Sequence, residues 1–314
     1  MPQAKGSRSQ VVFDWETAYG ADPSSVNGAI LPFNTFGLRS NRNQIVPATI
    51  TGTRNPVMPI QGNMDCRGPV TVPVDVTNFG FWLKALLNVP ATTGGPTYVH
   101  TFKVPTSLLS MVLELGILDI PYYLKFNGVK VNSLSIDFGQ DAELVANVDL
   151  MAAKETGSAS PYDAVVAMET FTRFTMRQLT IAEGGASSSI IGTGNITVSN
   201  NLDGNSFVIG GGGIRGALPS QVVEVSGNIR AMFTSATLYN KAVNTTESSL
   251  KLTATNGTNV LEIFLPELHY QQTGIPVETP GGIWAELNFV GYYENSAEET
   301  AFQVKLTNGK ASYA

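Results

Sequence analysis

The residue types that most often perform catalysis or bind transition metals are scarce in this chain. It contains two histidines and one cysteine in 314 residues. A single cysteine, Cys66, excludes an internal disulfide framework and a thiolate zinc site. We interpret it as a small apolar residue, buried or half-buried. His100 and His269 lie in strand-like sequence, and we expect both to be exposed or lightly buried. The sequence therefore predicts no catalytic residue and no metal site.

One glycine-rich segment formally fits a nucleotide-binding pattern. Residues 211–216 read GGGIRG, which matches G-x-G-x-x-G. A dinucleotide site needs this loop to open a helix after a buried strand. Here Pro219 follows three residues later, and residues 221–225 resemble a strand. We interpret the glycines as a flexible loop and expect no cofactor.

Acidic clusters are the remaining candidates for general acid-base chemistry. The candidates are Glu298 with Glu299, and Asp137, Asp141 and Glu143. The first pair lies in a polar turn and the second group around a hairpin, where carboxylates are ordinarily solvated and not catalytic. No G-x-S-x-G turn marks a nucleophile. We therefore expect that the chain is not an enzyme.

The charge balance argues against specific binding to nucleic acid. The chain has 19 basic and 25 acidic residues, for a net charge of −6. Its densest basic stretch, Arg39, Arg42 and Arg54, is well spread, whereas DNA-binding proteins need a basic face to displace counterions from phosphate.

The composition favours a subunit of an assembly. Charged residues make up 14% of the chain, against about 25% in typical soluble domains. With 43% hydrophobic residues, the remaining surface must be rich in small polar and apolar side chains, which suits permanent contact with other chains. The first ten residues do not resemble a signal peptide. The most apolar stretch, residues 108–124, is broken by Glu114 and Asp119, so we expect no membrane segment and synthesis in a cytoplasm.

Most of the chain reads as short alternating strands separated by glycine, asparagine and proline. The predicted strands are residues 46–53, 70–76, 109–115, 130–138, 144–150, 221–232, 250–255, 261–265 and 284–293. The Asn127-Gly128 and Asn256-Gly257 pairs predict tight hairpin turns. This spacing, with little helix, predicts a mainly β fold of antiparallel sandwiches or half-barrels.

Two short helices interrupt the strands. In residues 75–88, apolar residues recur at helical spacing, with Thr77 or Asn78 as the expected N-cap. The side chains predicted to pack this helix on the core are Phe79, Trp82, Leu83 and Leu86. Residues 235–244 repeat the pattern more briefly.

The two helices are part of an internal repeat. Arg54 matches Arg215, Gly68 matches Gly227 and Lys84 matches Lys241, with offsets that drift only from 161 to 157. An extra loop at residues 88–106 lowers the later offsets, and residues 152–163 have linker composition. We predict an N-terminal arm with the first strands at residues 1–40, a first β domain at 41–160 and a second at 161–314, each domain with one short helix.

Several stretches, taken in order, resemble the two-domain major tail tube proteins of tailed bacteriophages. They are ITGTRNPVMP (50–59), GPVTVPV (68–74), FWLKALL (81–87), GVKVNSLSIDF (128–138), DLMA (149–152), ITVSNNLD (196–203), LEIFLPEL (261–268) and AELNFV (285–290). The resemblance spans about residues 10 to 295, and its specificity lies in the order of these degenerate motifs.

The resemblance implies a structural subunit of a virion tail, assembled in the host cytoplasm. Such subunits close into rings, and the rings stack into a tube that delivers the genome. A tape-measure protein and the DNA would pass through the channel without specific binding, and tail tip and tail terminator proteins would contact its ends. Six tube domains per ring favour a trimer of two-domain chains over a hexamer. The alternative is a carbohydrate- or receptor-binding β-sandwich protein of the virion.

Two long connections are the expected contacts between rings. Residues 39–68 and their counterpart, residues 199–227, are rich in Asn, Gly, Pro and Arg, and loops of this length are usually functional or ordered by a partner. The residues expected to contact the neighbouring ring are Arg54, Asn55, Pro56, Met58, Arg215 and Leu218. Shortening residues 53–64 is expected to leave a folded subunit that does not polymerise.

Overall fold

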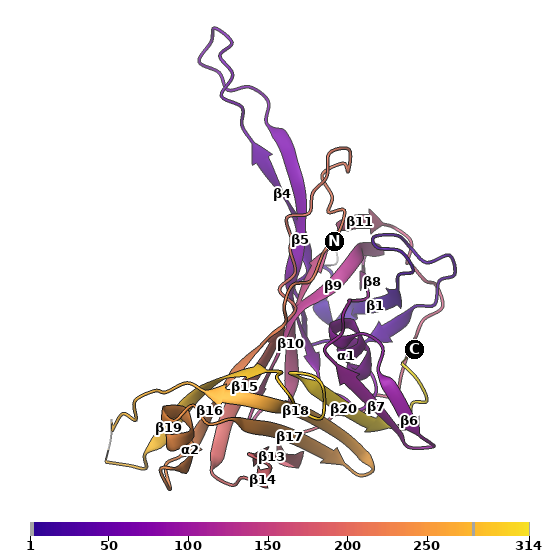
Figure 1. The fold of residues 1–314 in the computed structure, drawn as a ribbon. Helices are drawn as coiled ribbons and strands as arrows, with labels where there is room; N and C mark the ends of the chain where they lie inside the picture. Colours follow the sequence, from indigo (N-terminus) through magenta and orange to yellow (C-terminus); the bar gives the residue numbers. More distant parts are fainter. Residues whose placement is uncertain (1–2, 278–279, 314) are drawn as a thin grey trace.

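The computed structural model describes residues 3–277 and 280–313, and these form a mainly β fold, as predicted (Figure 1). Two α-helices and two 3-10 helices accompany the strands: α1 (Phe79–Leu87), α2 (Thr237–Val243), η1 (Gly6–Arg8) and η2 (Met176–Gln178). The strands are β1 (Ser9–Trp15), β2 (Ala29–Leu31), β3 (Thr35–Phe36), β4 (Arg39–Ile45), β5 (Ile60–Pro73), β6 (Ala91–Gly94), β7 (Tyr98–Lys103), β8 (Met111–Ile117), β9 (Tyr122–Phe138), β10 (Val145–Ala152), β11 (Lys154–Ser158), β12 (Ala167–Met168), β13 (Leu179–Glu183), β14 (Ala186–Ser187), β15 (Ile191–Ser199), β16 (Glu224–Met232), β17 (Ser248–Asn256), β18 (Asn259–Tyr270), β19 (Trp284–Tyr292) and β20 (Gln303–Asn308).

A single antiparallel layer runs through both halves of the chain. Its strand order is β4-β5-β10-β9-β15-β16-β19-β18, and β3 continues the line of β4 beside β5. The halves meet where residues 133–138 of β9 pair with residues 194–199 of β15. Both halves therefore contribute four strands to one sheet, which is called the shared sheet below.

Each half adds a second layer through one long strand. The first part of β9 leaves the shared sheet and pairs with β8 and β11, and β8 continues to β1 and β2. In the second half β18 pairs in the same way with β17 and β20, and β17 continues to β13 and β14. The short strand β12 pairs in parallel with β2. The same succession of pairings thus occurs twice, as expected of an internal repeat.

The Asn127-Gly128 pair does not form the predicted hairpin turn. It lies inside β9, at the point where this strand changes partners from β8 to β10. Gly128 has φ +64°, and a Cβ there would approach Ala153 and Tyr19 within 3 Å, so the pair bends a continuous strand instead of ending it. Asn256-Gly257 does connect two strands, β17 and β18, as predicted.

The predicted extra loop at residues 88–106 contains a β-hairpin. Its strands β6 and β7 pair with each other, and β7 also pairs with β20 of the second half. The first half thereby extends the second layer of the other half. The two halves are joined in both layers.

The predicted strand at residues 46–53 is wrong, because the chain forms no strand between Ile45 and Ile60. Pro47 and Pro56 cannot donate to a strand ladder, and Gly52 adopts φ +76°. The apolar residues of this stretch, such as Ile50 at 96% exposure, have no core to cover. The alternation of apolar and polar residues was therefore not sufficient to predict a strand at residues 46–53.

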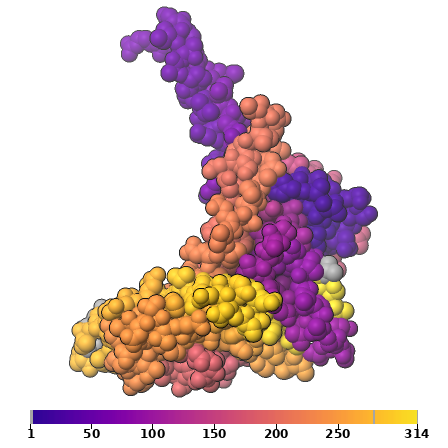
Figure 2. Space-filling model, in the orientation of Figure 1, coloured from indigo at the N-terminus to yellow at the C-terminus, as the bar shows by residue number. Residues whose placement is uncertain are grey.

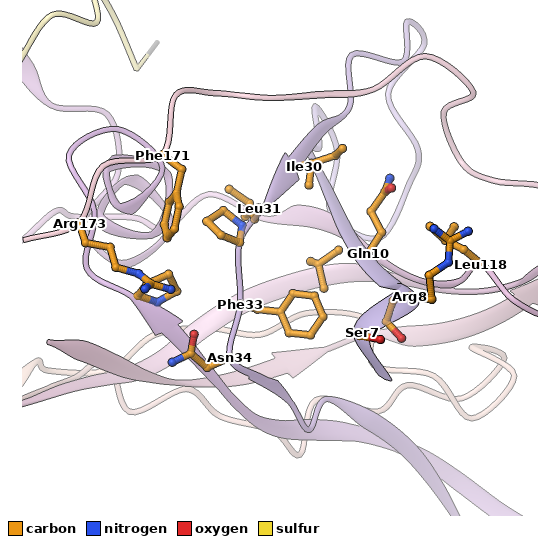
Figure 3. Close-up of a pocket in the computed structure, with 14 residues that line it drawn as sticks. Ser7, Arg8, Gln10, Ile30, Leu31, Phe33, Asn34, Leu118, Phe171 and Arg173 are labelled. Atoms are coloured by element: carbon orange, nitrogen blue, oxygen red, sulfur yellow. The ribbon is translucent and has the colours of Figure 1, made fainter. Parts of the chain in front are cut away.

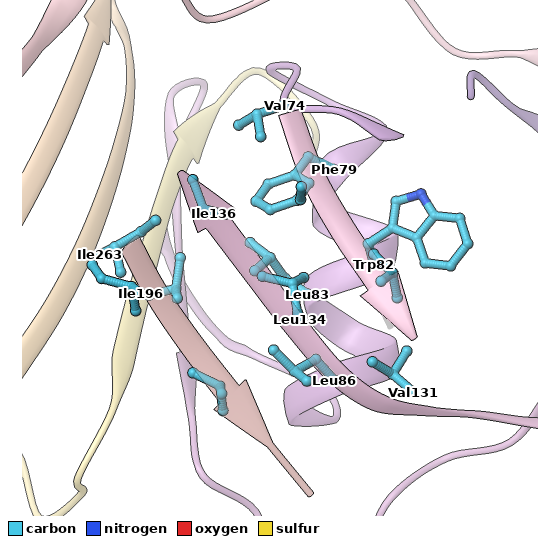
Figure 4. Close-up of a cluster of buried hydrophobic side chains, with 14 of the residues drawn as sticks. Val74, Phe79, Trp82, Leu83, Leu86, Val131, Leu134, Ile136, Ile196 and Ile263 are labelled. Atoms are coloured by element: carbon cyan, nitrogen blue, oxygen red, sulfur yellow. The ribbon is translucent and has the colours of Figure 1, made fainter. Parts of the chain in front are cut away.

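Helix α1 lies in the core against β9 (Figure 4). Phe79, Trp82, Leu83 and Leu86 are each no more than 2% exposed. Asn78 is the N-cap residue, one of the two predicted, but its side chain makes no capping hydrogen bond. Instead the carboxylate of Asp75 accepts hydrogen bonds from the backbone N–H groups of residues 77, 78 and 79. These bonds satisfy donors that the start of a helix leaves unpaired.

The two helices carry lysines in different environments. Lys241 of α2 forms an ion pair with Glu183 at 2.7 Å and donates to the Ser248 hydroxyl. Lys84 of α1 is 4% exposed, and its Nζ lies 4.3 Å from the ring centroid of Trp15. Within the described residues no hydrogen-bond acceptor or carboxylate pairs with it. Burial lowers the pKa of Lys84 to about 8.

Replacing Lys84 with methionine is expected to stabilise the subunit at neutral pH. The folded state holds the Lys84 proton less tightly than the unfolded state, whose pKa is 10.5. Stability of the native chain therefore rises as the pH increases from 8 to 10.5. Lys84→Met removes this cost and should raise the free energy of unfolding at pH 7 by about 2–3 kcal/mol, and this advantage should fall progressively as the pH rises from 8 to 10.5.

Urea unfolding at pH 7, 9 and 10.5 measures this difference. Lys241→Met is the matched control, because it removes the partner of a mostly buried carboxylate and should destabilise by about 1–3 kcal/mol. A Lys84→Met subunit that is less stable than the native one at pH 7 would contradict the expectation.

Candidate functional site

One face of the shared sheet is polar and the other is buried. A row across five strands places Thr71, Asn147, Ser135, Thr197 and Ser226 side by side. The adjacent row on the opposite face is Val70, Val148, Leu134, Val198 and Val225, each no more than 3% exposed. The alternation gives one broad sheet with a solvent face that continues from one half into the other.

Charges on the polar face are mixed in sign. The residues are Asp137, Asp149, Glu224 and Glu286 with Arg39, Arg67 and Arg230. Arg230 pairs with Glu286 at 3.6 Å and Arg67 with Asp65 at 2.9 Å. The Asn195 amide donates to the Asp137 carboxylate. Such a face offers hydrogen bonds but no continuous track of cations for phosphate groups.

The β4–β5 hairpin extends well beyond the body of the subunit (Figures 1 and 2). We call β4, β5 and the loop at residues 46–59 the arm. Of the residues that the sequence assigned to contacts with another ring, four lie in its loop, Arg54, Asn55, Pro56 and Met58, and all four are exposed. Met58 is 82% exposed and Ile50 is 96% exposed. The tip therefore presents apolar and basic side chains that no other described residue of the chain covers.

The counterpart connection in the second half, residues 200–223, lies along the base of the arm (Figure 2). The Met64 backbone N–H donates to the Gly213 carbonyl at 2.7 Å, and the Lys130 ammonium donates to the Leu218 carbonyl. We call this segment the bracing loop. Its side chains Arg215 and Leu218, also assigned from sequence to contacts between rings, are 2% and 1% exposed. Both side chains are therefore buried within this chain and do not present a surface to a neighbouring ring.

Arg215 holds the bracing loop to the arm. Its guanidinium donates to the carbonyls of Gly204, Cys66 and Ala152 at 2.7–3.1 Å and to the Asp65 carboxylate. It also lies 5.3 Å from the Phe207 ring centroid. No sequence pattern indicates this role, because an arginine in a glycine-rich loop is ordinarily exposed.

The electrostatics of this contact follow from the two arginines that share Asp65. Burial acts to raise the pKa of Asp65, but hydrogen bonds from Arg215 and Arg67 outweigh it and hold the pKa below its usual value. The neighbouring Cys66 thiol is fully buried, and its pKa is raised to about 12 by burial. This thiol is therefore an inert core group.

The histidines do not form a reactive site. His100 is fully buried, contrary to the expectation of an exposed or lightly buried residue. Its ring contacts the Thr92 hydroxyl, the Asn308 side chain and the Lys310 carbonyl, and burial lowers its pKa. His269 lies against Tyr292. Among the described residues, no cluster of three or more His, Cys, Asp or Glu side chains could hold a metal ion.

A surface hollow of about 330 Å³ lies beside β1 and β2 (Figure 3). Phe33, Ile30, Leu31 and Phe171 supply apolar surface to it. Its two arginines are already paired, Arg8 with Asp119 at 3.3 Å and Arg173 with Glu143 at 3.0 Å. The hollow brings together no nucleophile and base, and it assigns no chemistry to the chain.

The described residues contain no helix that is both long and apolar enough to cross a membrane. In comparisons with known proteins, the family model described as phage tail tube protein matches residues 6–291. No curated protein matches the chain.

Proposed function

Since the chain belongs to the phage tail tube protein family, a structural component of the virion tail, we propose that it polymerises into stacked rings whose central channel delivers the genome. The observation that carries this proposal is the shared sheet. This sheet is curved and has one buried face and one polar face. Its two edge strands can pair with strands of neighbouring copies.

The size of the sheet fits a ring of three chains. Each chain supplies eight strands to the shared sheet, so three copies supply twenty-four. At ~4.8 Å between strands and a tilt near 40°, a barrel of this size is about 45–50 Å across between backbones. That is wide enough for a DNA duplex after side chains are added.

The trimer is proposed over the hexamer because neither half is peripheral to the shared sheet. Both halves place four strands in it, and residues 133–138 pair directly with residues 194–199. A hexamer would need one half of each chain to leave the barrel. The first half of each chain ends near residue 160, so a ring of three chains contains six halves. Around this ring, interfaces within a chain alternate with interfaces between chains.

We assign the polar face to the channel wall. Asparagine, serine and threonine side chains there, with charges of both signs, allow passage of the tape-measure protein and DNA without specific binding. A wall of unpaired lysines and arginines would bind the duplex at every ring through counterion release. The arm tip, with Arg54, Asn55, Pro56 and Met58, contacts the next ring, and tail terminator and tail tip proteins contact the two ends of the tube. Assembly takes place in the host cytoplasm.

Negative-stain electron microscopy of the purified chain tests the proposal. We expect tubes or stacked rings with threefold symmetry and a central channel. Monomers at every concentration, confirmed by gel filtration, would overturn the proposed function. Rings of six chains would retain the function and overturn the trimer.

A further inference from the structure

The junction between the two halves shows how one copy of this fold joins the next. Residues 133–138 of β9 pair with β10 on one edge. On their other edge they pair antiparallel with residues 194–199 of β15. Both strands belong to four-strand units of the same order, β4-β5-β10-β9 and β15-β16-β19-β18. The junction is therefore a contact between equivalent units that happen to share a chain.

The repeat identifies which segments occupy the same positions at the outer ends of the chain. β15 pairs with β16 as β3 and β4 pair with β5, with Gly227 and Gly68 at corresponding places. β18 pairs with β19 as β9 pairs with β10. The counterpart of β15 is thus residues 35–41. The counterpart of the last part of β9 is the segment that follows β18, residues 271–277.

The start of residues 271–277 follows β19, although this segment is not a regular strand in the single chain. The Gln271 backbone N–H donates to the Asn288 carbonyl at 2.8 Å, one step beyond the pairing of Tyr270 with Phe289. The Thr273 hydroxyl donates to the Glu286 carbonyl. Within the described residues, no strand pairs with the other edge of this segment.

The opposite end of the sheet has an equally open edge. Among the described strands, β3 and β4 pair only with β5. On their other side, the Ser40 backbone N–H donates to the Glu155 carboxylate at 2.9 Å. A side chain that occupies an edge donor is a common device against uncontrolled strand addition.

From these two edges we infer that residues 271–277 of one copy pair antiparallel with residues 35–41 of the next copy, and that this pairing closes the ring. The inference rests on the proposed function and names the contact that makes it possible. The junction inside each chain is the template, so the two kinds of interface alternate around one continuous barrel. Pro276 removes one ladder hydrogen bond, which is tolerated at the end of a strand.

Paired cysteines test the contact at two places along it. In antiparallel strands the sum of the paired residue numbers is constant, and paired Cα atoms lie ~4.5–5.5 Å apart, within reach of a disulfide. The matched variants are Ser40→Cys with Gln272→Cys or Thr273→Cys, and Phe36→Cys with Pro276→Cys or Val277→Cys. All variants also carry Cys66→Ala, because residue 40 is paired with Cys66 across β4 and β5 and a cysteine at position 40 would lie within reach of a disulfide inside the same chain.

After oxidation of assembled tubes, we expect a matched pair at each place to give a ladder of covalent oligomers that ends at the trimer on a non-reducing gel. The control pair, Ser40→Cys with Val277→Cys, should stay monomeric, because four or five residues of strand separate these positions by roughly 14–17 Å.

Tubes that form normally but cross-link in no matched pair would overturn the inference and leave the proposed function intact. Cross-linking of the control pair in place of the matched pairs would overturn the antiparallel arrangement. Failure of the native chain to form rings at all is a separate result, visible by microscopy, that contradicts the proposed function itself.

Discussion

A subunit whose arm tip is replaced by a tight turn is expected to fold and to form rings, but not tubes. In this variant an Asn-Gly turn replaces residues 46–59 and joins Ile45 directly to Ile60, which already face each other across β4 and β5. The removed segment is exposed and makes no core contact, so stability should change by less than about 1 kcal/mol. The length distribution of assemblies by electron microscopy measures the effect.

The control for this variant keeps the length of the arm and changes its chemistry. Met58→Ser with Ile50→Ser removes two apolar side chains that are 82% and 96% exposed. Shorter tubes from this variant would assign part of the stacking energy to apolar contacts. Normal tubes from the shortened variant would show that the arm does not connect rings.

Arg215→Met is expected to destabilise the subunit by about 3–5 kcal/mol, the usual cost of breaking a buried charge pair. The substitution leaves the carbonyls of Cys66 and Ala152 without their donor and removes the contact that holds the bracing loop to the arm. Urea unfolding of the isolated subunit gives the change in free energy. Faster proteolysis within residues 200–223 would locate the damage.

Arg67→Met is the matched control, because Arg67 donates to the same Asp65 carboxylate from an exposed position. Its side chain is 56% exposed, against 1% for Arg215. Exposed ion pairs contribute about 0–1 kcal/mol, so this variant should remain near native stability. Equal losses in the two variants would show that burial of Arg215 is not what makes its network stabilising.

Local patterns predicted those elements whose partners lie nearby. The spacing of Phe79, Trp82, Leu83 and Leu86 is enough to define a helix with one buried face, because that face needs any core and not a particular strand. Asn256-Gly257 forms a hairpin turn because β17 and β18 pair with each other directly.

Other features depended on residues distant in the sequence. Asn127-Gly128 carries the same turn signal as Asn256-Gly257, yet β9 runs through it because β10 and β15 supply partners on the far side. Arg215 is buried only because the carbonyls of Cys66 and Ala152, 149 and 63 residues away, converge on it. Neither partner set can be seen in a window of sequence around the residue itself.

The junction of β9 with β15 has a consequence for the accuracy of assembly. Identical single-unit subunits can close erroneously around five or seven members when their interfaces are slightly flexible. A chain that fixes two units in one sheet can close only around an even number of them. The covalent connection excludes a ring with one unit too many or too few. An incorrect ring must gain or lose two units, which requires a much larger change in the curvature of the sheet. In the proposed ring, the covalent connection between the two halves therefore restricts the number of units before any contact between chains is made.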